Sequence, residues 1–294
     1  MTCFSHALRR LGWRCAAAVL LVPFPALAAD PQNYQLGLSE PVSPLAVAQA
    51  AFHDNLLMPI LTGIVLLVLL LLVYVSWRFS ARRNPNPSKT THNTLLEIAW
   101  TAAPVLILLV ILFPSLRVLY QSADVSNPEM TVKVTGHQWY WSYAYPDHEG
   151  IEFDSMLMAR TEEEAREMNV RRLMDVDNPL VVPTGTRIRM LFTSADVLHN
   201  WAVSEFGIRM DTVPGRLNEQ MLIIPEGREG QYYGFCSELC GVDHSFMPIS
   251  VRAVTRAAFD SWVQSGGQTA VAGAPQPDVP ALPQSGETVA VLAD

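Results

Sequence analysis

The stretch CSELCGVDHSFM, at positions 236–247, places two thiols, an imidazole and a thioether within twelve residues of one another. Its candidate ligands are Cys236, Cys240, His244 and Met247. Thiolate and thioether ligands select copper, whereas a zinc site seldom recruits a methionine. The stretch therefore predicts a copper-binding loop, which we call the ligand loop.

A second histidine lies upstream of the ligand loop, in the stretch DVLHNW at positions 196–201. We expect this residue, His199, to stand at the end of a strand. One distant histidine and a Cys/His/Met loop are typical of blue-copper-type β domains. A mononuclear site of that type uses one thiolate, so the second cysteine suggests a centre in which both sulfur atoms bridge two copper ions.

The residues before the ligand loop have the pattern of a β domain. His137, Trp139, Trp141, Tyr143 and Tyr145 alternate with other residues and are expected to share one face of a strand. Further strands are predicted at 187–190, 220–224, 231–235 and 248–254, and short helices at 161–168 and 257–263. The predicted fold is mainly β: a cupredoxin-like sandwich or barrel with antiparallel strands.

Two apolar runs precede this domain. Residues 56–77 and 98–116 carry no charge, and the first, with 22 residues, extends about 33 Å as a helix, enough to cross a bilayer. The segment between them contains Arg78, Arg82, Arg83 and Lys89, which places that short loop in the cytoplasm. Both ends of the mature chain then face the opposite side, the periplasm of a bacterial inner membrane.

The first residues have the pattern of an export signal: Arg9, Arg10 and Arg14, then an apolar stretch at 15–25 and the sequence ALA at 26–28. Export favours a Cys236–Cys240 disulfide, the first alternative to a copper centre, and a structural zinc site is the second. The expected division of the chain is a signal peptide (1–29), an outer segment (30–54), a first span (55–79), a cytoplasmic loop (80–94), a second span (95–120), the β domain (125–264) and a disordered tail (265–294).

Charge is divided unevenly. The sequence carries 16% charged residues and a net charge of -8, and the acidic excess lies in residues 125–294. Ordinary soluble domains carry about a quarter charged residues, so the low value agrees with a membrane protein. An acidic second half excludes nucleic acid as a partner and would attract a basic protein, although acidic surfaces also serve solubility alone.

The chain resembles subunit II of the haem-copper cytochrome c oxidases over roughly residues 34–264. The resemblance is carried by the stretches GHQWYWSY (136–143), DVLH (196–199), VPGRLN (213–218) and CSELCGVDHSFMP (236–248). It implies that Cys236 and Cys240 bridge a dinuclear copper centre, CuA, that His199 and His244 each cap one copper ion, and that Met247 is a weak ligand. It further implies that Glu238 binds copper through its carbonyl and a magnesium or manganese ion through its carboxylate, at the interface with subunit I.

The resemblance also implies a function: electrons from cytochrome c reach the copper centre and pass to a haem in subunit I, where oxygen is reduced and protons are pumped. Trp139 would be the residue through which electrons arrive, and Glu97 would stand at the mouth of a proton-uptake path. A carboxylate beside the bilayer is costly and therefore a functional candidate. Five acids would steer cytochrome c: Asp147, Glu149, Asp154, Asp177 and Asp196.

Ala144 and Ala195 stand where many relatives carry acids, which weakens the expected docking of cytochrome c.

Two competing functions share part of this pattern. A quinol oxidase subunit II would share the spans and the sandwich but lacks the copper ligands. A membrane-anchored copper carrier would need the ligand loop alone, without the HQWYW strand or Glu97, and is the remaining alternative.

Overall fold

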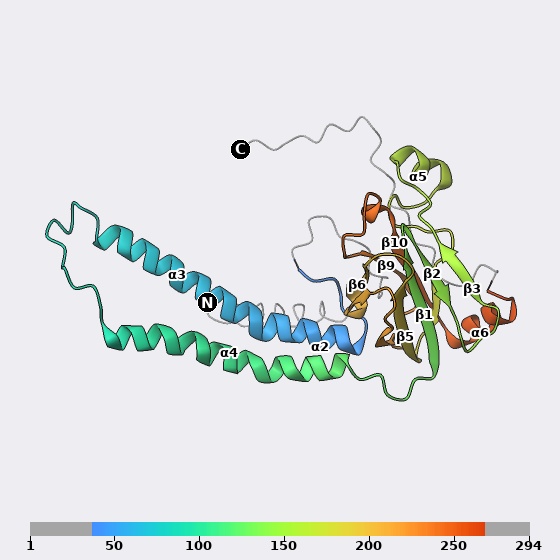
Figure 1. Ribbon diagram of the computed structural model, residues 1–294, viewed down its shortest axis with the longest axis horizontal. Coiled ribbons are helices and arrows are strands. Elements are labelled where there is room, and N and C mark those ends of the chain that lie inside the picture. Colours follow the sequence, from blue (N-terminus) through green and yellow to red (C-terminus); the bar gives the residue numbers. More distant parts are fainter. Residues whose placement is uncertain (1–36, 268–294) are drawn as a thin grey trace, which may run out of the picture.

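The computed structural model describes residues 37–267 and consists of a long helical hairpin attached to a β domain (Figure 1). The predicted signal peptide and nearly all of the predicted tail lie outside the described residues. The hairpin extends away from the β domain, and its two helices lie closest together beside that domain, where α2 contacts α4, and separate toward the connecting loop.

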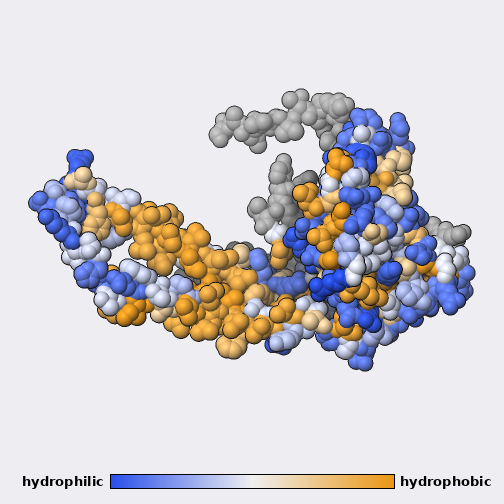
Figure 2. All heavy atoms as spheres, in the orientation of Figure 1, coloured by the Kyte–Doolittle hydropathy of each residue, from blue (hydrophilic) through white to orange (hydrophobic). Residues whose placement is uncertain are grey.

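The hairpin is built from two apolar helices. The first comprises α2 (Pro44–Phe52), one π-helical turn (His53–Leu57) and α3 (Met58–Arg78), and the second is α4 (Thr94–Ser122). Ser43 and Asn93 cap the two helices by accepting hydrogen bonds from backbone N–H groups of the first turn. Both helices are long and apolar enough to cross a membrane, and their apolar side chains are exposed around the hairpin (Figure 2).

The β domain contains two five-stranded sheets. One has the order β3 (Glu152–Ser155), β2 (Tyr140–Ala144), β1 (Met130–His137), β5 (Arg187–Ser194) and β8 (Asn218–Ile223). The other has the order β4 (Leu180–Pro183), β10 (Pro248–Val254), β9 (Gly230–Cys236), β6 (His199–Val203) and β7 (Ile208–Thr212). This two-sheet arrangement confirms the predicted mainly β, cupredoxin-like fold.

The expectation of purely antiparallel sheets is wrong. Strand β1 pairs with β5 in parallel, and β10 pairs with β4 in parallel. Parallel neighbours need a long connection between them, and here each pair is separated by other strands and helices. The alternation in the sequence predicts the buried face of each strand but not the direction of its neighbour.

The expectation of one strand running from His137 to Tyr145 is also wrong. The chain reverses after His137, and β1 and β2 form an antiparallel hairpin in which His137 lies opposite Tyr140. Only the second part of the alternation is buried in the core: Trp141 and Tyr143 of β2, and Tyr145 directly after it. Trp139 stands at the turn, which is fixed by contacts to the ligand loop.

Two short helices complete the domain. Helix α5 (Glu162–Met168) begins at a capping box, in which the side chains of Thr161 and Glu164 each accept a hydrogen bond from the other residue's backbone N–H. Helix α6 (Arg256–Gln264) buries Phe259 and Trp262, whose rings pack against Tyr145. Helix α6 therefore covers part of the aromatic core, whereas α5 is mostly exposed.

Candidate metal centre

The candidate ligands come from two adjacent strands and the loop that joins β9 to β10. Cys236 is the last residue of β9, and it pairs with Trp201 of β6. His199 lies two residues before Trp201, so its side chain points to the same face of the sheet. His199 opens β6, which corrects the prediction that it ends a strand. Met247 immediately precedes β10, so the whole ligand loop is held between neighbouring strands.

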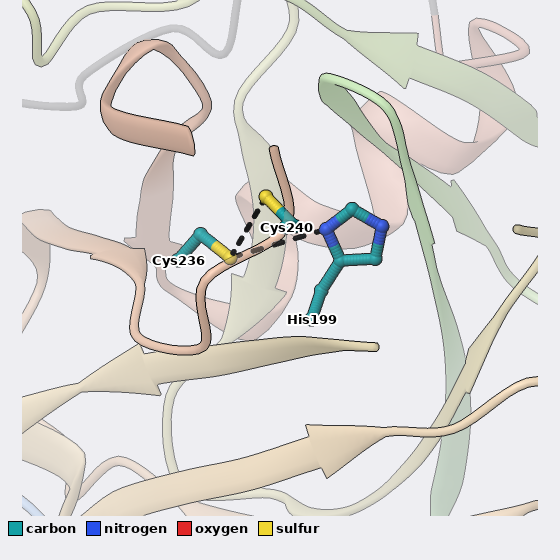
Figure 3. A group of neighbouring side chains, drawn as sticks. All are labelled: His199, Cys236 and Cys240. Carbon is teal, nitrogen blue, oxygen red and sulfur yellow. Dashed lines mark hydrogen bonds between the residues drawn. The ribbon is translucent and has the colours of Figure 1, made fainter. Parts of the chain in front are cut away.

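The ligand atoms converge on one point (Figure 3). Each of His199, Cys236 and Cys240 offers one ligand atom, and these three atoms lie within 4.8 Å of one another. All three residues are buried. The two sulfur atoms are 3.9 Å apart, and Cys236 Sγ lies 3.9 Å from His199 Nδ1. Both thiols are free, so the disulfide alternative is not formed in this structure.

The rest of the ligand loop completes the set around Cys240. His244 Nδ1 lies 3.4 Å and Met247 Sδ lies 3.5 Å from Cys240 Sγ. The carbonyl oxygen of Glu238 lies 3.3 Å from Cys236 Sγ. Each thiol thus has its own imidazole neighbour, and the donor set of two thiols, two imidazoles and a thioether fits copper better than zinc.

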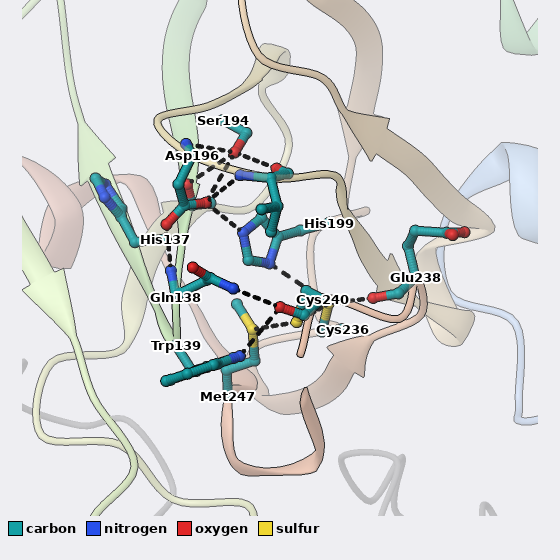
Figure 4. Close-up of polar contacts among 12 residues, drawn as sticks. His137, Gln138, Trp139, Ser194, Asp196, His199, Cys236, Glu238, Cys240 and Met247 are labelled. Atoms are coloured by element: carbon teal, nitrogen blue, oxygen red, sulfur yellow. Dashed lines mark hydrogen bonds and ion pairs between the residues drawn. The ribbon is translucent and has the colours of Figure 1, made fainter. Parts of the chain in front are cut away.

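The carbonyl of Cys240 is held by the β1–β2 hairpin (Figure 4). Gln138 Nε2 donates a 2.8 Å hydrogen bond to this oxygen, and Trp139 Nε1 donates one of 3.3 Å. A Cβ added to Gly241 would lie 3.0 Å from the Trp139 ring, so a larger residue there would crowd the indole. The predicted electron-uptake residue therefore contacts the peptide of a candidate ligand directly.

A hydrogen-bond network orients His199. Its Nε2 lies 2.9 Å from Asp196 Oδ1, which leaves Nδ1 directed at Cys236. The other carboxylate oxygen of Asp196 accepts a hydrogen bond of 2.6 Å from the backbone N–H of Gln138. Carboxylate–imidazole pairs of this kind fix the tautomer and the ring orientation of metal-binding histidines.

A further hydrogen bond supports Met247. The indole Nε1 of Trp141, which is fully buried, donates a 3.2 Å hydrogen bond to the carbonyl of Met247. The backbone at this ligand is therefore tied to the aromatic core.

The pKa values of the site reflect these contacts. Burial raises the pKa of Cys236, but hydrogen bonds from His199 and from backbone groups outweigh it and lower the pKa to about 7. Burial and the neighbouring charge of Cys236 raise the pKa of Cys240. Burial lowers the pKa of His199, but its hydrogen bonds to Cys236 and Asp196 outweigh burial and leave the pKa above its ordinary value. One proton therefore leaves the thiol pair readily, and a metal cation would favour loss of the second.

The residues predicted to dock a partner have mixed environments. Asp147, Asp154 and Asp177 each accept a hydrogen bond from within the domain, from Thr131 N, Ser142 Oγ and Met156 N respectively. Glu149 is exposed. Asp196, which the sequence assigns to docking, also orients His199.

Glu238 and Glu97 lie outside the sulfur cluster. The carboxylate of Glu238 is exposed and points away from the thiols (Figure 4). Glu97 lies in the first turn of α4, at the end of the hairpin far from the β domain, and it accepts a hydrogen bond from Asn93 N at 3.3 Å.

Sequence reasoning missed Gln138 and the positioning role of Asp196. The DVLH spacing, with a carboxylate three residues before the histidine, is a signal that could have found Asp196. Gln138 has no such local signal, because its contact depends on a hairpin that lies 102 residues from Cys240.

Two family models match the chain. The model of the cytochrome c oxidase subunit II periplasmic domain matches residues 130–254, and that of the cytochrome c oxidase subunit II transmembrane domain matches residues 31–118. A probable cytochrome c oxidase subunit 2 of Rickettsia bellii is 45% identical over 84% of this chain and 89% of its own length. The cytochrome c oxidase subunit 2 of Arabidopsis thaliana is 42% identical over 82% of this chain and 92% of its own length.

A solved structure is also similar. The periplasmic domain of subunit II of the cytochrome oxidase of Bradyrhizobium japonicum is 45% identical, covers 49% of this chain and 97% of its own, and superposes with a TM-score of 0.44.

Proposed function

Because this chain belongs to the family of cytochrome c oxidase subunit II, part of a haem-copper oxidase complex, we propose that it delivers electrons from cytochrome c to that complex. The electrons would arrive at a dinuclear copper centre in the β domain and continue to a haem in subunit I. Oxygen reduction and proton pumping would be activities of the whole complex, with subunit I as the main partner.

One observation carries this proposal: the paired arrangement of thiols and imidazoles. His199 lies beside Cys236, and His244 lies beside Cys240. Cys236 and Cys240 would both be shared between the metal ions, each histidine would bind one ion, and Met247 and the Glu238 carbonyl would complete the set. When bound, such a centre supplies a one-electron carrier whose charge is spread over both metal ions.

The residues around the site would hold this centre and exclude water from it. Cys236, Cys240, Met247 and His199 are buried, which keeps the sulfur atoms away from solvent. The Asp196 carboxylate keeps Nδ1 of His199 directed at the thiol. These fixed contacts favour a rigid site, which suits electron transfer because few groups must move when the charge changes.

Trp139 would connect this site to cytochrome c. Its indole is partly exposed and donates a hydrogen bond to the carbonyl of Cys240. This contact joins a partly exposed aromatic ring to the ligand loop. The acids Asp147, Glu149, Asp154, Asp177 and Asp196 would attract the basic face of the donor.

A second metal site would lie on the face toward subunit I. The exposed carboxylate of Glu238 points away from the thiols, and its own carbonyl faces Cys236. One residue could therefore contact both a copper ion and a magnesium or manganese ion, as hard cations prefer carboxylate oxygen.

The helical hairpin would anchor the chain in a bacterial inner membrane, with the β domain and both mature ends in the periplasm. The basic residues between α3 and α4 support this orientation. Glu97 would then stand at the cytoplasmic side, at the start of a proton-uptake path. Replacing Glu97→Gln should slow proton uptake by the assembled oxidase while the copper signal stays unchanged, and unchanged uptake would contradict the assignment.

The proposal is tested by affinity purification of the full chain in mild detergent, with an optical spectrum and a metal count. Co-purifying haem and about two copper ions per chain beyond those of subunit I are expected. Purification without haem would favour the alternative, a membrane-anchored copper carrier. The hydrogen bonds from Gln138 and Trp139 of the β1–β2 hairpin to Cys240 argue against that alternative, since a carrier needs only the ligand loop.

A further inference from the structure

Residues 156–177, within the segment between β3 and β4, form a small folded unit that contains α5 (Figure 1). Its two ends are tied by an isolated β-bridge between Leu157 and Val176. The capping-box carboxylate of Glu164 also accepts a 2.7 Å hydrogen bond from the backbone N–H of Arg160. The backbone of Arg160 is therefore fixed just before α5 begins.

The side chain of Arg160 crosses from this unit to the ligand loop. Its Nη2 lies 3.1 Å from Asp243 Oδ2, and its guanidinium carbon lies 4.7 Å from the centroid of the Phe246 ring. One cation thus makes an ion pair and a cation–π contact with two residues of the same short turn.

These two residues flank the candidate ligands. Asp243 directly precedes His244, and Phe246 directly precedes Met247. The turn is closed by a 2.8 Å hydrogen bond from Phe246 N to Asp243 O, which joins the two residues directly. Both ligands lie beside Cys240 Sγ, His244 at 3.4 Å and Met247 at 3.5 Å.

The rest of the site has different supports. His199 is held by Asp196, the Cys240 carbonyl by Gln138 and Trp139, and the Met247 carbonyl by Trp141. Arg160 acts on the outer turn of the ligand loop, residues 241–246, in which Val242 is exposed to 82% and Asp243 and His244 are only partly buried. An external tie matters most at such a turn, because solvent competes for its polar groups.

We propose that Arg160 is a positioning residue for the metal centre, which acts through Asp243 and Phe246 to hold His244 and Met247 in place. The inference rests on the proposed function, since it concerns the copper centre of the assembled protein. Arg160 does not touch the metal. Its loss loosens His244 and the side chain of Met247, whose carbonyl stays bonded to Trp141, while the His199–Cys236 half keeps its contacts.

The test compares Arg160→Met, Arg160→Lys and the control Arg166→Met in the purified oxidase complex. Arg166 lies in the last turn of α5 and is exposed, so its loss removes the same charge from the same unit. The measurements are the rate of copper loss to a chelator and the EPR hyperfine pattern of the copper centre. Arg160→Met should lose copper about fivefold faster, as expected from removing an exposed ion pair and a cation–π contact.

The hyperfine pattern separates positioning from general stability. In Arg160→Met the two copper ions should become unequal, because only the His244 side loses its support. Arg160→Lys keeps the charge and should recover part of both effects, and Arg166→Met should match the wild type. A double-mutant cycle with Asp243→Asn should show that the two losses do not add.

Several outcomes would overturn the inference. Wild-type copper retention and hyperfine pattern in Arg160→Met would do so, as would a lowered unfolding temperature with an unchanged EPR signal. Equal effects of Arg166→Met would also count against it. Absence of copper from the wild-type complex would instead overturn the proposed function, and the inference would fall with it. Haem absorbance in each variant checks that the complex has assembled.

Discussion

The indole Nε1 of Trp139 donates a 3.3 Å hydrogen bond to the carbonyl of Cys240. The two residues are 101 positions apart in the sequence, and the contact joins the turn of the β1–β2 hairpin to the ligand loop. A partly exposed aromatic ring is thus hydrogen-bonded to the backbone of Cys240, a residue that we propose as a copper ligand.

Replacing Trp139→Phe should slow electron uptake from cytochrome c about tenfold or more, which is about 1.4 kcal/mol in the barrier. The phenyl ring keeps an aromatic surface but loses the donor to Cys240. Stopped-flow reduction of the copper centre measures the rate, and metal analysis should show unchanged copper. Tyr140→Phe, in the same hairpin, is the control. Uptake at the wild-type rate in Trp139→Phe would remove the assignment.

Replacing Asp196→Asn should weaken copper binding by about ten- to hundredfold, the usual cost of losing a carboxylate partner of a ligating histidine. The carboxylate holds the imidazole of His199 and also accepts a hydrogen bond from Gln138 N. Competition with a chelator measures the affinity, and Asp177→Asn serves as the control because Asp177 accepts from the backbone N–H of Met156. A raised KM for cytochrome c with unchanged copper affinity would assign Asp196 to docking alone.

Docking through the five predicted acids implies a strong dependence on salt. Raising the ionic strength shortens the Debye length to about 10 Å at 0.1 M, so the KM for cytochrome c should rise and the association rate should fall. Glu149→Gln should raise the KM roughly twofold at low salt, the effect of one exposed charge, and have little effect at high salt. Turnover that does not change with ionic strength would contradict electrostatic docking.

Much of this architecture could be predicted because its signals are local. The spacing of Cys236, Cys240, His244 and Met247 predicts a metal loop without knowledge of the fold, and the two uncharged runs predict the hairpin. The alternation of polar and apolar residues at 187–190 predicts a strand with one inward face, and β5 buries Ile188 and Met190.

The remainder depends on tertiary structure. The parallel pairing of β1 with β5 has no signal in the sequence of either strand. The chain reverses after His137, although the alternation of residues in the sequence continues without a break. The ties from Gln138 and Arg160 to the ligand loop join residues 102 and 83 positions apart, and no periodicity reports such contacts.

The carboxyl of Glu205 provides a test of pH dependence away from the metal site. Burial raises its pKa, its Oε2 has no hydrogen-bond partner, and its own carbonyl accepts the backbone N–H groups of Val42 and Ser43. A carboxyl whose pKa is raised in the folded state stabilises the fold below its unfolded pKa, about 4.3, and loses this contribution as the pH rises through its folded pKa.

Glu205→Gln should therefore be more stable than the wild type at neutral pH, by about 1 kcal/mol, and should flatten the fall in stability above pH 4. Hydrogen exchange at Val42 and Ser43 in the full chain measures the local opening, and exposed Glu226→Gln is the control. Equal exchange in Glu205→Gln and the wild type at pH 5 and pH 8 would show that this carboxyl does not control the contact.

The central claim is that Cys236 and Cys240 together hold two copper ions that share one electron. The most direct test is metal quantitation of the purified oxidase combined with EPR of its partly oxidised copper centre. We predict about two copper ions per chain beyond those of subunit I, with a hyperfine pattern from one electron spread over both nuclei. About one copper ion per chain, with the signal of a single nucleus, would contradict the account.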